Sequence, residues 1–167
     1  MLKIRPEESG DRDTLFRLNS SAFGRDAEAK LVDSLRGNVY PYVSLVAELE
    51  GDIVGHILFT PVSVGNAVVR AAGLGPMAVT NRYRGKCIGA SLVEEGLRVV
   101  SEHGFAAVFV LGEPEYYMRF GFEPAADKDI FWKSDEFAPY FFSLELVPGA
   151  LDCVSGEVIF HPAFGNV

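Results

Sequence analysis

Metal ligands and disulfide partners are scarce in this sequence. It has two cysteines, Cys87 and Cys153, without C-x-x-C spacing, and its three histidines are widely separated. A thiolate zinc site or a disulfide framework needs more of these residues at suitable spacing. We therefore predict that both cysteines are reduced and that the protein holds no metal.

Long apolar runs and basic clusters are also missing. No stretch reaches the ~20 apolar residues of a membrane-spanning helix, and the opening MLKIRP is too short and too polar for a secretory signal. The net charge of −8 opposes the positive surface that binds nucleic acids. These absences predict a soluble, cytoplasmic protein without a membrane or nucleic-acid partner. We interpret the acidity as a solubility feature, although it also suits a cationic amine or a basic peptide.

What is present suffices for one folded domain. The 167 residues are 49% hydrophobic and include 13 phenylalanines, so the chain can bury a core without covalent staples. No internal repeat, low-complexity tract or linker-like change in composition divides it. We predict a single domain over residues 1–167.

The hydrophobic period changes repeatedly along the chain, which predicts alternating strands and helices. Helices are predicted at residues 12–18, with Ser9 or Asp11 as the cap, 27–36, 88–103 and 114–120. Strands are predicted at residues 2–5, 42–64 as a hairpin, 67–79 with a bulge or bend at its glycines, 106–111, 141–147 and 157–160, and a charged loop at 127–139. The continuous apolar run at 106–111 is typical of a strand that is buried on both faces.

The most informative segment is VTNRYRGKCIGASL, residues 79–92, where a strand passes through a glycine-containing turn into a helix. The first N–H groups of a helix have no internal partners and the helix dipole adds positive charge, so this turn can hold a phosphate. Arg84 and Lys86 either add charge to that site or are solvated loop cations. The segment predicts an anion site.

Two other phosphate motifs do not fit. A Walker A loop around Gly85 and Lys86 would need glycine at position 80 and Ser or Thr at position 87, and both are absent. Residues 73–78, GLGPMA, match the letters G-x-G-x-x-G/A, but a strand-like segment follows them rather than a helix. We interpret this second match as chance.

Residues 84–89, RGKCIG, resemble the Q/R-x-x-G-x-G/A pyrophosphate signature of the GNAT family of N-acetyltransferases, and residues 73–79 resemble the strand that precedes it there. Cys87 departs from the signature, because it stands where the family has its first glycine. The resemblance implies acetyl-CoA as the co-substrate. The cofactor-binding residues that it implies are Met77, Ala78, Val79, Arg84, Gly85, Lys86, Cys87, Ile88, Gly89 and Ala90.

A second match lies downstream, where residues 115–122, EYYMRFGF, resemble the family's aromatic-Tyr-x-x-x-Gly-Phe motif. In that register Tyr117 is the residue that protonates the departing coenzyme A thiolate. A phenol titrates near ~10, so it is protonated at neutral pH and can act as an acid. The alternative is an aromatic ring packed against the sheet, which suits Tyr116 as well as Tyr117.

The general base is less well indicated. Glu113 follows the buried strand and lies close in sequence to Tyr117, which makes it the first candidate, and His56 is the second. The alternatives are a carboxylate stabilised by a helix dipole and a histidine that is satisfied in the core.

The resemblance covers most of the chain and implies the fold and the reaction. The fold is a mixed α/β (α+β) domain with a central, mostly antiparallel sheet flanked by helices. The reaction is direct attack of a small-molecule or peptide amine on acetyl-CoA, in which a backbone N–H near Val79 polarises the thioester. The alternative is an inactive acyl-CoA-binding or interaction module. We expect the acceptor near residues 20–29 and 127–140, and the family implies a homodimer.

Overall fold

The computed structural model of the protein describes residues 1–166. Its helices are α1 (Arg12–Phe23), α2 (Ala27–Leu35), α3 (Ile88–Glu102) and α4 (Pro114–Met118), with short 3-10 helices η1 (Ser9–Asp11), η2 (Asn81–Tyr83), η3 (Ala125–Lys128), η4 (Asp135–Tyr140) and η5 (Pro162–Asn166). Its strands are β1 (Leu2–Pro6), β2 (Val43–Leu49), β3 (Asp52–Val64), β4 (Ala71–Val79), β5 (Ala107–Leu111), β6 (Glu123–Pro124), β7 (Ile130–Phe131), β8 (Phe141–Glu145) and β9 (Gly156–Ile159). No helix in this part of the chain is both long and apolar enough to cross a membrane.

The chain forms two compact units, each assembled from separate stretches of sequence. Unit 1 contains residues 1–60, 75–99 and the end of the chain from Pro162, and unit 2 contains residues 61–74 and 100–161. Strands β3 and β4 and helix α3 each continue from one unit into the other. The single domain expected over residues 1–167 stays a prediction.

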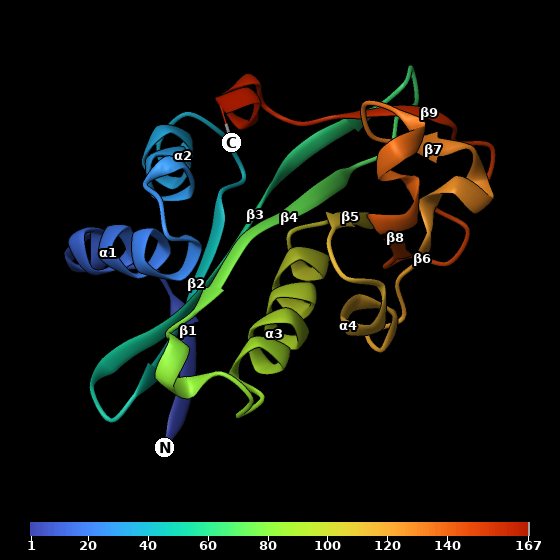
Figure 1. The fold of residues 1–167 in the computed structure, drawn as a ribbon. Coiled ribbons are helices and arrows are strands. Elements are labelled where there is room, and N and C mark those ends of the chain that lie inside the picture. The colour runs from blue at the N-terminus through green and yellow to red at the C-terminus, as the bar shows by residue number, and fades with distance from the viewer. Residues whose placement is uncertain (167) are drawn as a thin grey trace. The chain divides into compact units, whose positions relative to one another are not determined.

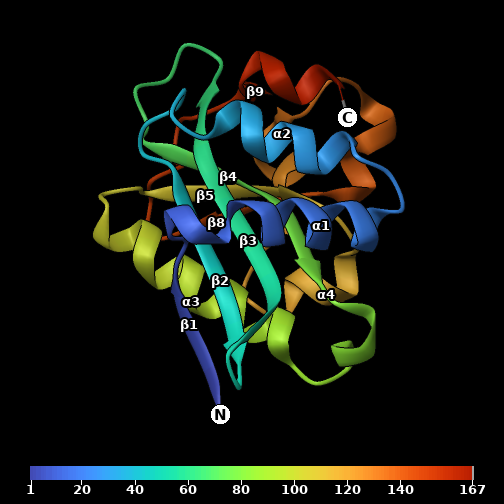
Figure 2. The same ribbon diagram turned by 90° about the vertical axis from the view of Figure 1, so that its left-hand side faces the viewer.

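Unit 1 is a sheet with helices on both faces. Strand β1 pairs antiparallel with β2, and β2 pairs antiparallel with β3 as the predicted hairpin, with an irregularity in register between Ala47 and Glu48. Helices α1 and α2 lie along one face of these strands and α3 along the other (Figures 1 and 2). Close packing on the α3 face depends on glycine, because a Cβ on Gly96 would overlap the ring of Phe59. Helix α3 therefore has a fixed place on the sheet.

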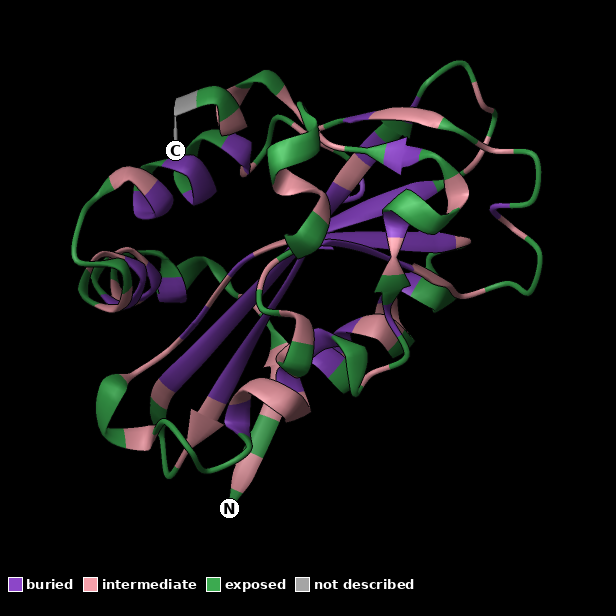
Figure 3. Ribbon diagram, turned by 45° about the vertical axis from the view of Figure 1, so that its right-hand side comes forward, coloured by how far each residue is buried: buried purple, intermediate pink, exposed green. Residues whose placement is uncertain are grey.

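Unit 2 is built around β5, which is buried except at Leu111 (Figure 3). Strand β5 pairs parallel with residues 71–74 of β4 and antiparallel with β8, and β8 pairs antiparallel with β6. The rings of Phe109 and Phe141 stack at 5.8 Å in this core. The strand predicted at residues 106–111 is confirmed as a buried central strand, and the antiparallel pairings of both units confirm the predicted fold class.

Three local features differ from the sequence predictions. Strand β4 begins at Ala71 rather than at residue 67, and Gly75 within it has a φ of 146°, a conformation that favours glycine. The loop expected at residues 127–139 contains β7, which pairs with β9, and most of η4. Asp11 precedes α1 without capping it, because its carboxylate accepts hydrogen bonds from Arg5 and from the Glu8 N–H instead.

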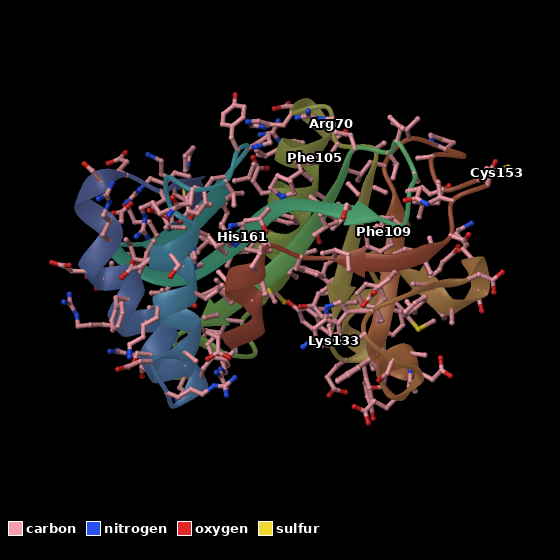
Figure 4. All side chains as sticks on the ribbon, turned by 90° about the horizontal axis from the view of Figure 1, so that it is seen from above. Arg70, Phe105, Phe109, Lys133, Cys153 and His161 are labelled. Atoms are coloured by element: carbon pink, nitrogen blue, oxygen red, sulfur yellow. The ribbon has the colours of Figure 1, made fainter. Side chains whose placement is uncertain are left out.

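Unit 2 also holds an arginine against an aromatic ring. The Arg70 guanidinium lies 4.9 Å from the ring centre of Phe105 and donates a 3.0 Å hydrogen bond to the His103 carbonyl (Figure 4). This contact fastens the end of α3 within unit 2 to the chain that enters β4. Cys153 is exposed on the same unit.

Candidate functional site

The turn between β4 and α3 has the backbone of an anion site. Gly85 and Cys87 have φ values of 78° and 63°, and α3 begins at the next residue, Ile88. The Cys87 carbonyl accepts the Ser91 N–H at 3.1 Å, which is the first hydrogen bond of the helix. Because that bond starts at Ser91, the N–H groups of residues 88–90 have no carbonyl within the helix to bind. The turn therefore presents donors and the positive end of the helix dipole together.

Three basic side chains surround this turn. Arg82 and Lys86 lie 5.2 and 5.6 Å from the ring centre of Tyr83. Arg84 donates hydrogen bonds to the backbone carbonyls of Val79, at 3.3 Å, and Ala22, at 3.4 Å. Arg84 thus fastens the turn to the ends of β4 and α1, and all three residues add positive charge.

The end of β4 is held in register beside the turn. The Thr80 N–H donates to the Val54 carbonyl of β3 at 2.8 Å. Ala78 is buried, whereas Met77 and Val79 are half-buried. All ten residues predicted to bind the cofactor lie in unit 1.

Tyr117 lies in unit 2, on the short helix α4, and is fixed by its neighbours. Its ring packs edge-on against Tyr116 at 5.0 Å and Phe122 at 5.8 Å. A Cβ on Gly112 would overlap the Tyr117 ring, so glycine is required under it. Burial, and then the neighbouring Tyr116, raise the pKa of Tyr117 above its usual value. The phenol therefore stays protonated at neutral pH, as a general acid must.

Glu113 is exposed at the junction of β5 and α4. It lines a hollow of about 750 Å³ on unit 2. The other lining residues are Pro114, Glu115, Tyr116, Arg119 and Tyr140. Gly112 and Tyr140 were not among the candidate site residues of the sequence. Tyr140 lines the hollow, and its carbonyl accepts a 2.8 Å hydrogen bond from the Gly112 N–H. No group of three His, Cys, Asp or Glu residues that could hold a metal occurs within residues 1–166.

His56, the second candidate base, lies in a chain of buried hydrogen bonds in unit 1. Its Nδ1 lies 3.2 Å from the Asn19 amide, and its Nε2 lies 2.8 Å from Ser44 Oγ. Ser44 Oγ in turn donates to Glu7 Oε1 at 2.5 Å. The Asn19 amide donates to Nδ1 of His56, so Nδ1 carries no proton. The Ser44 hydroxyl donates its proton to Glu7, so its oxygen accepts from His56, and the network assigns the proton of a neutral His56 to Nε2.

The same network explains the electrostatics of His56. The side chain is fully buried, and burial lowers its pKa to about 4. Burial also raises the pKa of Glu7, but hydrogen bonds from Arg36, Ser44 and Tyr42 outweigh it and hold that pKa below the usual value. A neutral histidine with both nitrogens engaged has no free lone pair for an amine. The structure therefore favours the structural alternative for His56.

We expect Cys87→Gly to raise the free energy of unfolding by up to about 1 kcal/mol, because a side chain in the left-handed region strains the backbone by about that amount. Urea unfolding measures the change. Cys87→Ala removes the thiol but keeps the Cβ, so it should give no gain. Equal stabilisation by both variants would show that the thiol, and not the backbone, is the cause.

His56 should make the protein sensitive to mild acid. Its pKa is about 6.5 when exposed and about 4 in the fold, so the unfolded chain binds the proton first as the pH falls. The contribution of His56 to the free energy of unfolding is fully present above pH 6.5, and it falls by up to about 3 kcal/mol as the pH falls to 4. Urea unfolding across this range should show a shallower loss in His56→Gln than in the wild type. Parallel pH profiles for the two proteins would refute this assignment.

Comparison with known proteins identifies the family. The model of the acetyltransferase (GNAT) domain matches residues 3–125. YhbS of Escherichia coli K12, named an uncharacterized N-acetyltransferase, is 40% identical over 166 residues that cover 98% of both chains. The crystal structure of E. coli YhbS in complex with CoA superimposes with a TM-score of 0.92 at 38% identity and covers 98% of this chain and 92% of that one. A GNAT acetyltransferase from Brucella melitensis in complex with acetyl-CoA has a TM-score of 0.82 at 33% identity, with 98% of both chains covered. The protein belongs to the GNAT family of N-acetyltransferases.

Proposed function

We propose that the protein transfers the acetyl group of acetyl-CoA to an amine. The observation that carries the proposal is the turn of residues 84–89, with glycine and cysteine in left-handed conformations at the start of α3, in a chain of the GNAT family. Two relatives at 33% and 38% identity are known in complex with acetyl-CoA and CoA. The homodimer implied by the resemblance stays a prediction.

The cofactor would be held through its phosphates and its pantetheine arm. The N–H groups of residues 88–90 and the charges of Arg82 and Lys86 suit the pyrophosphate. The backbone of β4 at residues 77–79 suits the amides of pantetheine, because the Thr80–Val54 hydrogen bond keeps this end of the strand in place. Arg84 supports the turn by its bonds to backbone carbonyls.

The proposed chemistry is direct transfer. The neutral amine attacks the thioester carbonyl and forms the C–N bond, and the C–S bond then breaks to release the thiolate. Tyr117 donates its phenolic proton to that thiolate, and its raised pKa keeps the proton available at neutral pH. Glu113 accepts a proton from the amine, directly or through water. Glu113 then releases its proton to solvent and Tyr117 takes one up from solvent, so the protons balance over one turnover.

The first experiment is calorimetric titration with acetyl-CoA. The wild type should bind it saturably, and Gly89→Glu should abolish binding because a carboxylate then occupies the proposed phosphate site. Gly10→Glu makes the same substitution at a position with nothing within 4 Å, and it should bind as the wild type does. If the wild type does not bind acetyl-CoA, the proposed function is wrong, whereas binding without turnover of any amine would favour the inactive module.

Two substitutions test the proton transfers through thiol release at saturating acetyl-CoA. Tyr117→Phe should lower the maximal rate about 100-fold, which is a typical contribution of a general acid. Glu113→Gln should lower the rate most at neutral pH and less at alkaline pH, where the amine loses its proton without help. Gly112→Ala serves as a positioning test, since its Cβ displaces the Tyr117 ring while the phenol remains. A wild-type maximal rate in Tyr117→Phe would remove the acid role.

A further inference from the structure

The hollow beside α4 has the size and lining of a small-molecule site. Its volume of about 750 Å³ lies within the usual range of roughly 300–1,000 Å³ for ligand sites. Three of its lining residues, Pro114, Glu115 and Tyr116, belong to α4, the short helix of unit 2 that also carries Tyr117. Two tyrosines, Tyr116 and Tyr140, and three charged side chains, Glu113, Glu115 and Arg119, are among its lining residues.

The lining groups favour a positive ligand. Glu113 and Glu115 contribute two carboxylates, against one cation from Arg119. The Arg119 guanidinium lies 4.4 Å from the ring centre of Tyr116 and 4.9 Å from that of Phe120, so its charge is directed onto aromatic rings. The carboxylates exceed the cations in number, and the phenol ring of Tyr140 can attract an ammonium group through its face.

The electrostatics of the whole unit reinforce this preference. Unit 2 contains eleven Asp and Glu residues and four Lys and Arg residues, a net charge of −7. Unit 1 contains twelve acidic and eleven basic residues, a net charge of −1. Nearly all the net negative charge of the protein therefore belongs to the unit that carries the hollow. Such a field concentrates cations around it and repels anions.

We propose that this hollow selects acceptors that carry a second positive charge, such as a diamine or an amine on a basic peptide. The inference rests on the proposed function and names its substrate class. The reacting amine must be neutral to attack, so it does not bind to the hollow as an ammonium cation. A second ammonium group keeps its proton, and the hollow offers it the Glu115 carboxylate together with the ring of Tyr140.

Three matched probes test the proposal: 1,4-diaminobutane, 1-aminobutane and 4-aminobutanoate. They share a four-carbon amine and differ at the far end, which is cationic, neutral or anionic. Thiol release at saturating acetyl-CoA gives kcat/KM for each. We expect kcat/KM for the diamine to exceed that for 1-aminobutane about two- to fivefold, because an exposed charge pair contributes up to about that factor, and we expect the anionic probe to be the poorest. Equal values for the three probes, or a preference for 4-aminobutanoate, would overturn the proposal.

A conservative variant locates the selectivity. Glu115→Gln keeps the shape of the side chain and should raise KM for 1,4-diaminobutane by up to about fivefold, and by more than it raises KM for 1-aminobutane. Glu136→Gln removes one exposed charge of the same unit outside the lining and should change none of these values. An equal loss in both variants would show that the overall charge, and not the hollow, selects the probe.

Binding decides the matter if none of the three probes releases thiol. Calorimetry of 1,4-diaminobutane with the acetyl-CoA-saturated protein should then show binding that weakens in Glu115→Gln, and absence of binding would overturn the inference. Failure of the proposed function looks different, because the wild type would then either not bind acetyl-CoA or release no thiol with any amine of a broader panel.

Discussion

The start of α3 is the constraint on which the candidate site depends. A helix can offer free N–H groups to a phosphate only if the chain before it turns away sharply, and here that turn requires left-handed conformations at Gly85 and Cys87. The position of the helix is set by close packing against the sheet, where Leu92 lies on Gly55 and Phe59 lies on Gly96. Neither glycine leaves room for a Cβ. Packing in the core of unit 1 therefore determines where the donors point.

Sequence patterns predicted the parts of the fold whose signals are local. The order of strands and helices, the hairpin, the buried strand β5 and the turn into α3 each follow from a period or a glycine within a few residues. The motif around Tyr117 is equally local, since the tyrosine lies on α4 with Gly112 beneath its ring. Local signals were weakest at residues 127–139, because two-residue strands such as β7 are too short to show a period.

Long-range partners could not be predicted from one sequence. Glu7, Asn19, Ser44 and His56 come from four separate segments, and only the fold joins them into one hydrogen-bonded chain. From the sequence, a histidine in an apolar strand is therefore compatible both with a catalytic base and with a core residue. Only its hydrogen-bond partners distinguish the two. The same is true of Tyr140, which reaches the hollow through the pairing of β8 with β5 and the hydrogen bond from Gly112.

The distribution of charge adds an argument that the total charge conceals. A net charge of −8 reads as a solubility feature when it is spread over the whole chain. The charge is not spread evenly. Unit 1 is nearly neutral and carries Arg82, Arg84 and Lys86 at the turn between β4 and α3, whereas unit 2 holds almost all the excess of carboxylates over cations. The strong negative charge of unit 2 attracts cations and repels anions, whereas the nearly neutral unit 1 leaves the positive charges beside the start of α3 uncancelled by any large excess of carboxylates. This charge therefore supports the acceptor that we propose for the hollow of unit 2, since it favours the approach of a cation over that of a neutral or anionic amine.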